Sequence, residues 1–224
     1  MVQKKMRRKL SVETKISNFV GRPKDLVKRE AIMVAARDLF LSKSYEGVSM
    51  AAIAAVAGVS KLTLYSHFAD KAALFQEVIS AKCQEHTNEK IYQDAGRLPI
   101  RQALQMIGEA FVHLVFSDDA MCLYRMMMQN APGQAAINQL FYEAGPQQIC
   151  SHIASLLATL APANALVMAD PRKAASHFIS LLKGEWHYAL SLQLIPTAPD
   201  TEVLRQHVDD CVDLLLRAYG VEAV

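Results

Sequence analysis

The stretch SMAAIAAVAGVSKLTLYSHF, residues 49–68, predicts two short helices that meet at Gly58. Ser49 is suited to cap the first helix, because its hydroxyl can accept a hydrogen bond from a free N–H of the first turn. Ile53 and Val56 recur at helical spacing on a face that we expect to be buried. A chain that leaves a helix often needs a positive φ, which glycine adopts without strain. The pattern is typical of a helix-turn-helix.

The second helix places two apolar residues, Leu64 and Phe68, one turn apart on its inner side. Ser60 is suited to cap it. The side chains left outside, Lys61, Thr63, Tyr65 and His67, can contact phosphates and base edges. An ordinary helical hairpin with a solvated face would have the same spacing, so the flanking residues must separate the two alternatives.

Those flanks resemble the DNA-binding domain of TetR-type transcriptional regulators over residues 26–86. The resemblance rests on four runs: VSMAAIA (48–54), AGVSK (57–61), TLYSHF (63–68) and DKAAL (70–74). Three positions depart from the family's usual pattern. Ser44 stands where glycine is usual, Leu62 where a small residue, Gly or Pro, is usual, and Ser49 where Thr is commoner. Leu62 can contact a thymine methyl group but cannot donate a hydrogen bond, so base reading at this position is in question.

Charge is distributed unevenly along the chain. Residues 1–75 hold 14 Lys and Arg against 6 Asp and Glu, whereas the remainder holds 10 against 16. The basic end is therefore the expected nucleic-acid end. Residues 1–25 are predicted to form a flexible basic arm that lies along DNA, although a solubilising tail would have the same composition. The predicted DNA-binding residues are Arg22, Lys24, Ser49, Ser60, Lys61, Leu62, Thr63, Tyr65, His67 and Lys71. Lys71 is included because the resemblance implies that the residue at this position contacts a phosphate.

Composition favours an all-α protein with a sizeable core. The chain has 224 residues, of which 52% are hydrophobic, and no segment alternates with a period of two. We expect the arm, a helix-turn-helix domain at 26–86, and a ligand-binding and dimerisation domain at 87–224. Cys83, Cys122, Cys150 and Cys211 form no C-x-x-C pair and are expected to be reduced, as in a cytoplasmic protein. Neither a secretory signal nor a membrane span is predicted.

Helical periodicity and capping residues predict the individual helices. The first is expected at 26–43, and one that begins after Asp70 should continue to about Tyr92, before a hinge near Gly96 and Pro99. The helices expected after it cover 101–116, 120–130, 133–160, 171–194 and 201–219. Asp118, Asp170 and Asp200 are suited to cap three of them. This half resembles, more weakly, the AcrR/AefR-like subset of the family.

The last two predicted helices carry apolar stripes. In the family these helices pair across a two-fold axis to form a four-helix dimer interface, and a dimer would present two recognition helices to a palindromic operator. The residues expected in the interface are Phe178, Leu182, Trp186, Leu204, Val208, Val212 and Leu215. The core of a monomer would produce the same stripes, so this alternative stays open.

Aromatic and methionine side chains with polar neighbours predict a small-molecule pocket between helices of the second domain. The candidates are Met106, Phe111, His113, Phe116, Tyr124, Met127, Phe141, Tyr142, His177 and Trp186. Ordinary core packing is the alternative for each of them. A soft-metal site near Cys122 and His113 has no supporting ligand spacing, and no cofactor is predicted.

Catalytic motifs are absent from the sequence: it contains no G-x-S-x-G, P-loop, H-E-x-x-H or dinucleotide fingerprint. The sequence therefore predicts a DNA-binding regulator, not an enzyme. We expect a repressor that binds a double-stranded palindromic operator as a homodimer and is released by a small apolar effector. The alternatives are an architectural DNA-binding protein without an effector, a metal-responsive regulator, and an enzyme built on a helical bundle.

Overall fold

The computed structural model describes residues 23–128, 134–164 and 166–220. Within these ranges every regular element is helical, and the only β-type pairing is an isolated bridge between Leu166 and Gly220. The all-α prediction is thus confirmed. The helices are α1 (Pro23–Lys43), α2 (Met50–Val56), α3 (Lys61–His67), α4 (Lys71–His86), α5 (Glu89–Ala95), α6 (Ile100–Val115), α7 (Asp118–Met127), α8 (Gln134–Ala144), α9 (Pro146–Leu160), α10 (Pro171–Ser191) and α11 (Thr201–Tyr219), with a 3₁₀ turn, η1, at Pro162–Asn164.

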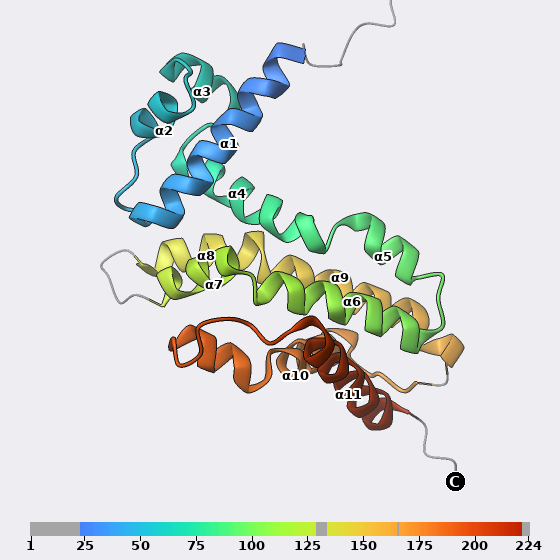
Figure 1. Ribbon diagram of the computed structural model, residues 1–224. Helices are drawn as coiled ribbons and strands as arrows, with labels where there is room; N and C mark the ends of the chain where they lie inside the picture. The colour runs from blue at the N-terminus through green and yellow to red at the C-terminus, as the bar shows by residue number, and fades with distance from the viewer. Residues whose placement is uncertain (1–22, 129–133, 165, 221–224) are drawn as a thin grey trace, which may run out of the picture.

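The helices are arranged in layers (Figure 1). A head made of α1 to α3 and the start of α4 lies at one end of the molecule. Helices α6 to α9 form the layer beneath α4 and α5, and α10 and α11 lie on the far side of that layer. The chain thus passes from the head into the body along α4.

The predicted helix-turn-helix is present, and both predicted serine caps form. The hydroxyl of Ser49 accepts a hydrogen bond from the N–H of Ala52, and that of Ser60 accepts one from the N–H of Thr63, both at 3.1 Å. Gly58 joins the two helices with a φ of +66°, a conformation that a residue with a Cβ adopts only under strain. These local interactions fix the angle at which α3 leaves α2.

The predicted buried face of α2 was partly wrong. Ile53 is fully buried as expected, but Val56 is 62% exposed. The face that packs into the head is made of Met50, Ile53 and Ala54, one turn nearer the start of the helix.

Three predicted helices are each divided by a break, and the one expected over 171–194 has a kink at Gly184, where φ is +51°. The helix expected to reach Tyr92 ends at His86, where Thr87 is buried and its hydroxyl donates a 2.7 Å hydrogen bond to the carbonyl of Cys83. Asn88 then caps α5. The helix expected over 133–160 is interrupted at Gly145, after which α9 begins with proline. In addition, Ser117 rather than Asp118 caps α7. At Asn88 and Ser117 a capping side chain competes with the continuing helical period, whereas at Gly145 no side chain caps α9 and the following proline starts the new helix.

Two apolar clusters hold the protein together. One lies within the body, between α5, α6, α7, α9, α10 and α11. The other fills the head and extends into the tip of the body through Leu123, Met126 and Met127 of α7 and Ile137 of α8. Cys83 of α4 touches both clusters. The head is therefore packed directly against α7 and α8, and α4 lies between the two cores.

Among the described residues, no helix is long and apolar enough to cross a membrane.

Candidate DNA-binding surface and central cavity

Helix α3 presents an exposed face that is partly apolar and partly polar. Leu62 is 83% exposed and Tyr65 51% exposed, and Lys61 lies beside them in the first turn. Lys61 makes no ion pair with any residue in the described ranges. Leu64, in contrast, is fully buried and anchors the helix to the head. The arrangement leaves the outer side chains of α3 available to a partner such as the major groove of DNA.

Two residues predicted to contact DNA, His67 and Lys71, also make contacts within the head. Nε2 of His67 lies 2.9 Å from a carboxylate oxygen of Asp25 in α1, and only 11% of the side chain is exposed. The two atoms are not aligned as a hydrogen bond, so the contact is an ion pair only when the histidine is protonated. The ring therefore lies at the junction of α3 and α1.

Lys71 ties the loop before α2 to the start of α4. Its ammonium donates hydrogen bonds to the carbonyls of Tyr45 (3.0 Å) and Val48 (3.1 Å), and its nitrogen lies 4.1 Å from the centroid of the Tyr45 ring. A carboxylate oxygen of Glu46 is 4.0 Å away. These contacts use the positive charge that the sequence analysis assigned to a phosphate, and they leave 23% of the side chain exposed.

The remaining predicted DNA-binding residues have simpler positions. Ser49 and Ser60 serve as helix caps, and the hydroxyls of Ser60 and Thr63 lie 2.9 Å apart. Arg22 lies outside the described residues, and Lys24 belongs to the first turn of α1.

Residues 23–75 contain seven Lys and Arg against five Asp and Glu, so most of the basic excess belongs to residues 1–22.

A cavity of about 130 Å³ lies where the head meets the body. Six helices contribute to its wall, and most of the lining is apolar. The lining residues are Ile79, Lys82 and Cys83 of α4, Phe111, Leu114 and Val115 of α6, Ala120, Leu123 and Tyr124 of α7, Phe141 of α8, Gly145, Pro146 and Ile149 around the start of α9, and Ile179, Lys183 and His187 of α10.

Phe111, Tyr124 and Phe141 are the predicted pocket residues that line this cavity. The others lie elsewhere. His113, Tyr142 and His177 are exposed, and Nδ1 of His177 lies 2.9 Å from the hydroxyl of Tyr219. Met127 belongs to the core between α7 and the head, and Met106 packs on the core of the body. Phe116 lines a separate polar depression, and the Trp186 ring packs edge-on against the His207 ring. Helical spacing identified some of the buried aromatic residues, included three exposed ones, and could not show which side chains border empty space.

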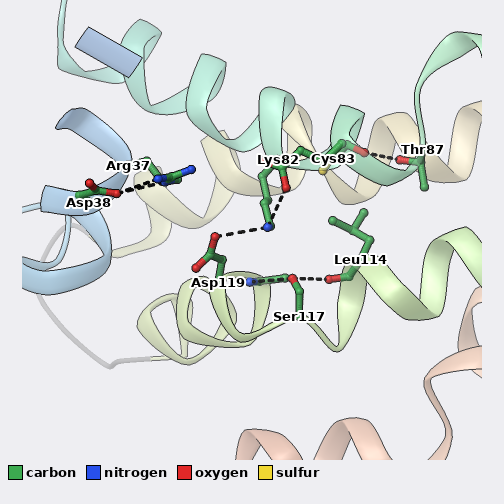
Figure 2. A network of polar contacts seen from close by, with 10 residues as sticks. Arg37, Asp38, Lys82, Cys83, Thr87, Leu114, Ser117 and Asp119 are labelled. Atoms are coloured by element: carbon green, nitrogen blue, oxygen red, sulfur yellow. Dashed lines mark hydrogen bonds and ion pairs between the residues drawn. The ribbon is translucent and has the colours of Figure 1, made fainter. Parts of the chain in front are cut away.

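The polar groups of the cavity wall were not predicted. Nζ of Lys82 lies 2.8 Å from a carboxylate oxygen of Glu85 and 3.3 Å from one of Asp119, so it links α4 to α7 (Figure 2). Burial raises the pKa of the Cys83 thiol to about 11, which keeps it protonated. Lys183 and His187 lie on either side of a kink in α10 at Gly184, whose φ is +51°, so their spacing of four residues in the sequence did not by itself show that both border the cavity.

The apolar stripes of α10 and α11 face the chain's own core. Four of the predicted interface residues are completely buried: Phe178, Leu182, Val208 and Val212. At most 4% of Leu204 or Leu215 is exposed, and Trp186 is half-buried. Gly108 of α6 allows a very close approach here, since a Cβ at this position would lie 2.6 Å from a methyl carbon of Val208. The prediction that these stripes form a dimer interface is therefore corrected: the monomer-core alternative accounts for them.

A different part of the same helices carries exposed apolar side chains. Tyr188 of α10 and Val203 and Leu214 of α11 are large and exposed. Val203 and Leu214 are separated by three helical turns and so lie on one side of α11. In the parts of the chain that the structure describes, no group of three or more His, Cys, Asp or Glu side chains is placed to hold a metal ion.

Comparison with known proteins identifies related sequences in both halves of the chain. Residues 102–221 match the family described as "AefR-like transcriptional repressor, C-terminal domain", and residues 32–78 match "Bacterial regulatory proteins, tetR family". Over 84 residues the chain is 32% identical to the transcriptional repressor BepR of Brucella suis, a match that covers 38% of this chain and 39% of BepR. It is 28% identical to the transcriptional repressor BdcR of Escherichia coli over 156 residues, which are 64% of this chain and 74% of BdcR. The chain spans less than half the length of the first curated relatives that it matches.

Solved structures share the whole fold. A TetR-family transcriptional regulator from Mesorhizobium loti superposes with a TM-score of 0.74 at 27% identity, covering 89% of this chain and all of that chain. The flavonoid-responsive regulator FrrA superposes with a TM-score of 0.68 at 29% identity, covering 88% of this chain and 98% of FrrA.

Proposed function

Because the chain belongs to the TetR family of bacterial regulatory proteins, we propose that it is a repressor that binds a palindromic operator as a homodimer and is released by a small apolar effector. The family consists of transcriptional regulators, not enzymes. The observation that carries the proposal is the position of α4. Leu74 and Phe75 near its start are buried in the head, and Ile79 and Cys83 further along line the cavity.

In this proposal, α3 reads the operator. Lys61, Leu62 and Tyr65 are exposed on one helix whose other side is anchored by Leu64, which leaves them free to enter the major groove. The Lys and Arg residues among positions 1–24 contribute phosphate contacts beside them. Counterion release by these charges makes operator affinity fall steeply with salt concentration.

The dimer forms through exposed faces of α10 and α11, since the predicted stripes are occupied by the core. Tyr188, Val203 and Leu214 supply the apolar contacts. A two-fold axis through this surface would present two recognition helices to two half-sites of a palindrome.

The effector occupies the cavity and changes the position of α4. A compound there touches α4 through Ile79, Lys82 and Cys83 and touches the body through α6 to α10, so its affinity depends on how α4 lies against the body. A hundredfold loss of operator affinity requires about 2.7 kcal/mol of difference between the two conformations. The cavity supports this function over that of an architectural DNA-binding protein, for which a solid body would suffice.

The test begins with selection of bound duplexes from a random library by the full chain. We expect a palindrome with half-sites related by a two-fold axis, and a dimer by light scattering. Leu214→Asp should shift the protein toward monomer and weaken operator binding, whereas Glu202→Gln, at an exposed position of the same helix, should not. Selection of no preferred sequence, or of a site without symmetry by a monomer, would overturn the proposal.

A further inference from the structure

The part of α10 that borders the cavity carries the ammonium group of Lys183. Ile179 and Lys183 lie one turn apart before the kink at Gly184, where φ is +51°, and His187 follows the kink; all three line the cavity. No carboxylate in the described ranges neutralises Lys183, and burial alone acts on it, lowering its pKa. A partly buried ammonium without a partner is unfavourable, because its hydration is lost and not replaced.

The second lysine of the cavity differs in this respect. Lys82 already has two carboxylates within 3.3 Å, Glu85 of its own helix and Asp119 of α7 (Figure 2). Its charge is compensated, and its role is to join α4 to α7. An anion that enters the cavity therefore meets the charge of Lys183 on α10, for which the described residues supply no carboxylate partner.

His187 contributes a polar group without a second charge. Burial, with a smaller effect of the nearby Lys183 ammonium, lowers the pKa of its imidazole to about 4, so the ring is neutral at physiological pH. The ring packs edge-on against Tyr124, with centroids 4.5 Å apart. The cavity thus combines one ammonium and one neutral imidazole with walls of Phe, Leu, Ile and Val.

The volume of the cavity limits the size of the ligand. An apolar cavity of about 150 Å³ accepts benzene, and this one has about 130 Å³, so a ring that also carries a charged group requires the wall to move slightly. A single ring or a short alkyl chain with one small charged group is close to this volume and matches the single charge.

We propose that the effector is a small hydrophobic monocarboxylate whose carboxylate pairs with Lys183 while its apolar part lies among Phe111, Phe141 and Ile149. The inference rests on the proposed function in taking this cavity as the effector site. It differs from the sequence-based expectation of an apolar effector by requiring one negative charge. A lysine whose stem only covers the apolar wall, with its ammonium turned to water, is the competing explanation.

The experiment compares acids with their neutral amides. Benzoate, phenylacetate and hexanoate, and the three corresponding primary amides, are titrated into the full chain at pH 7.5 by calorimetry. At least one acid should bind no less than tenfold more tightly than its amide, a difference of about 1.4 kcal/mol. Lys183→Met should remove this preference, because it keeps the length of the side chain and deletes the charge. Lys173→Met is the matched control, since Lys173 is exposed near the start of the same helix and lies outside the cavity wall.

The possible results separate this inference from the proposed function. Equal binding of acids and amides, a preference that persists in Lys183→Met, or no binding of any acid would overturn the assignment of Lys183. Operator release is followed in parallel by fluorescence anisotropy. Amides that bind and release the operator would leave the proposed function intact and refute the monocarboxylate. Acids that bind through Lys183 without changing operator affinity would support the charge assignment and refute the effector step of the proposed function.

Discussion

Replacing Lys71 with methionine separates a structural from a DNA-contacting role at the start of α4. The ammonium donates two hydrogen bonds to loop carbonyls and lies over the Tyr45 ring. A hydrogen bond that involves a charged group contributes about 1.5–3 kcal/mol and a cation–π contact about 0.5–1 kcal/mol. Against this stands the cost of withdrawing a largely covered ammonium from water. We therefore expect Lys71→Met to lower the free energy of unfolding by about 2 kcal/mol, because methionine keeps the apolar stem.

The assay is urea denaturation followed by far-UV circular dichroism at one fixed protein concentration, since a dimer's stability depends on concentration. With a slope of about 2 kcal/mol per molar urea, the midpoint should fall by roughly 1 M. Lys61→Met is the control: Lys61 is exposed on α3, so this variant should weaken operator binding and keep the wild-type midpoint. If Lys71→Met instead keeps the wild-type midpoint while losing operator affinity, the ammonium acts on phosphate and our reasoning about this residue is wrong.

Three further predictions address α3, the cavity and the head. Tyr65→Ala should weaken operator binding by about 1–3 kcal/mol in an anisotropy titration without moving the urea midpoint, because the ring is half exposed; a lowered midpoint would make Tyr65 structural. His187 has a pKa of about 4 when folded, against 6.5 normally, so the unfolded chain binds its proton more readily and stability is lost as pH falls through this window. Between pH 7.5 and 5 this loss should be about 2 kcal/mol in urea titrations, and His187→Phe should lack it; an equal loss in the variant would contradict the assignment. Ser44 has a φ of +63°, so Ser44→Gly should raise the midpoint of thermal unfolding by relieving up to about 1 kcal/mol of strain; a lower midpoint would show that backbone entropy outweighs it.

The elements that could be predicted are those that depend on neighbours in sequence. Ser49, Ser60, Asp170 and Asp200 cap helices as expected, because a capping side chain bonds to backbone only two or three residues away. Ser44 stands where the family usually has glycine, and its φ of +63° is the left-handed conformation that glycine adopts more easily. This feature too depends only on the local sequence. Recognising the family required only these short runs and the buried positions between them.

The partner of a buried face could not be predicted in the same way. The stripe containing Phe178 and Val208 showed that one side of each helix is covered, but periodicity carries no information about which surface covers it. Gly108, far away in the sequence, is what admits Val208 so closely and places the stripe inside the monomer. The cavity is a stronger case, because its wall comes from six helices and depends on breaks near Thr87 and Gly145 that helical period alone does not reveal.

The position of α4 limits how the cavity can communicate with the head. This helix is held to α7 by the ion pair of Lys82 with Asp119 and by apolar contacts with Leu123. Lys82 and Leu123 both border the cavity. An ion pair near the surface contributes at most about 1 kcal/mol, so its loss alone cannot supply the roughly 2.7 kcal/mol that a hundredfold change in operator affinity requires. The larger part must come from repacking α4 against α7 and α8, where Met126, Met127 and Ile137 belong to the core of the head. A ligand that merely competes for Lys82 should therefore release the operator weakly, whereas one whose bulk displaces Leu123 should release it fully.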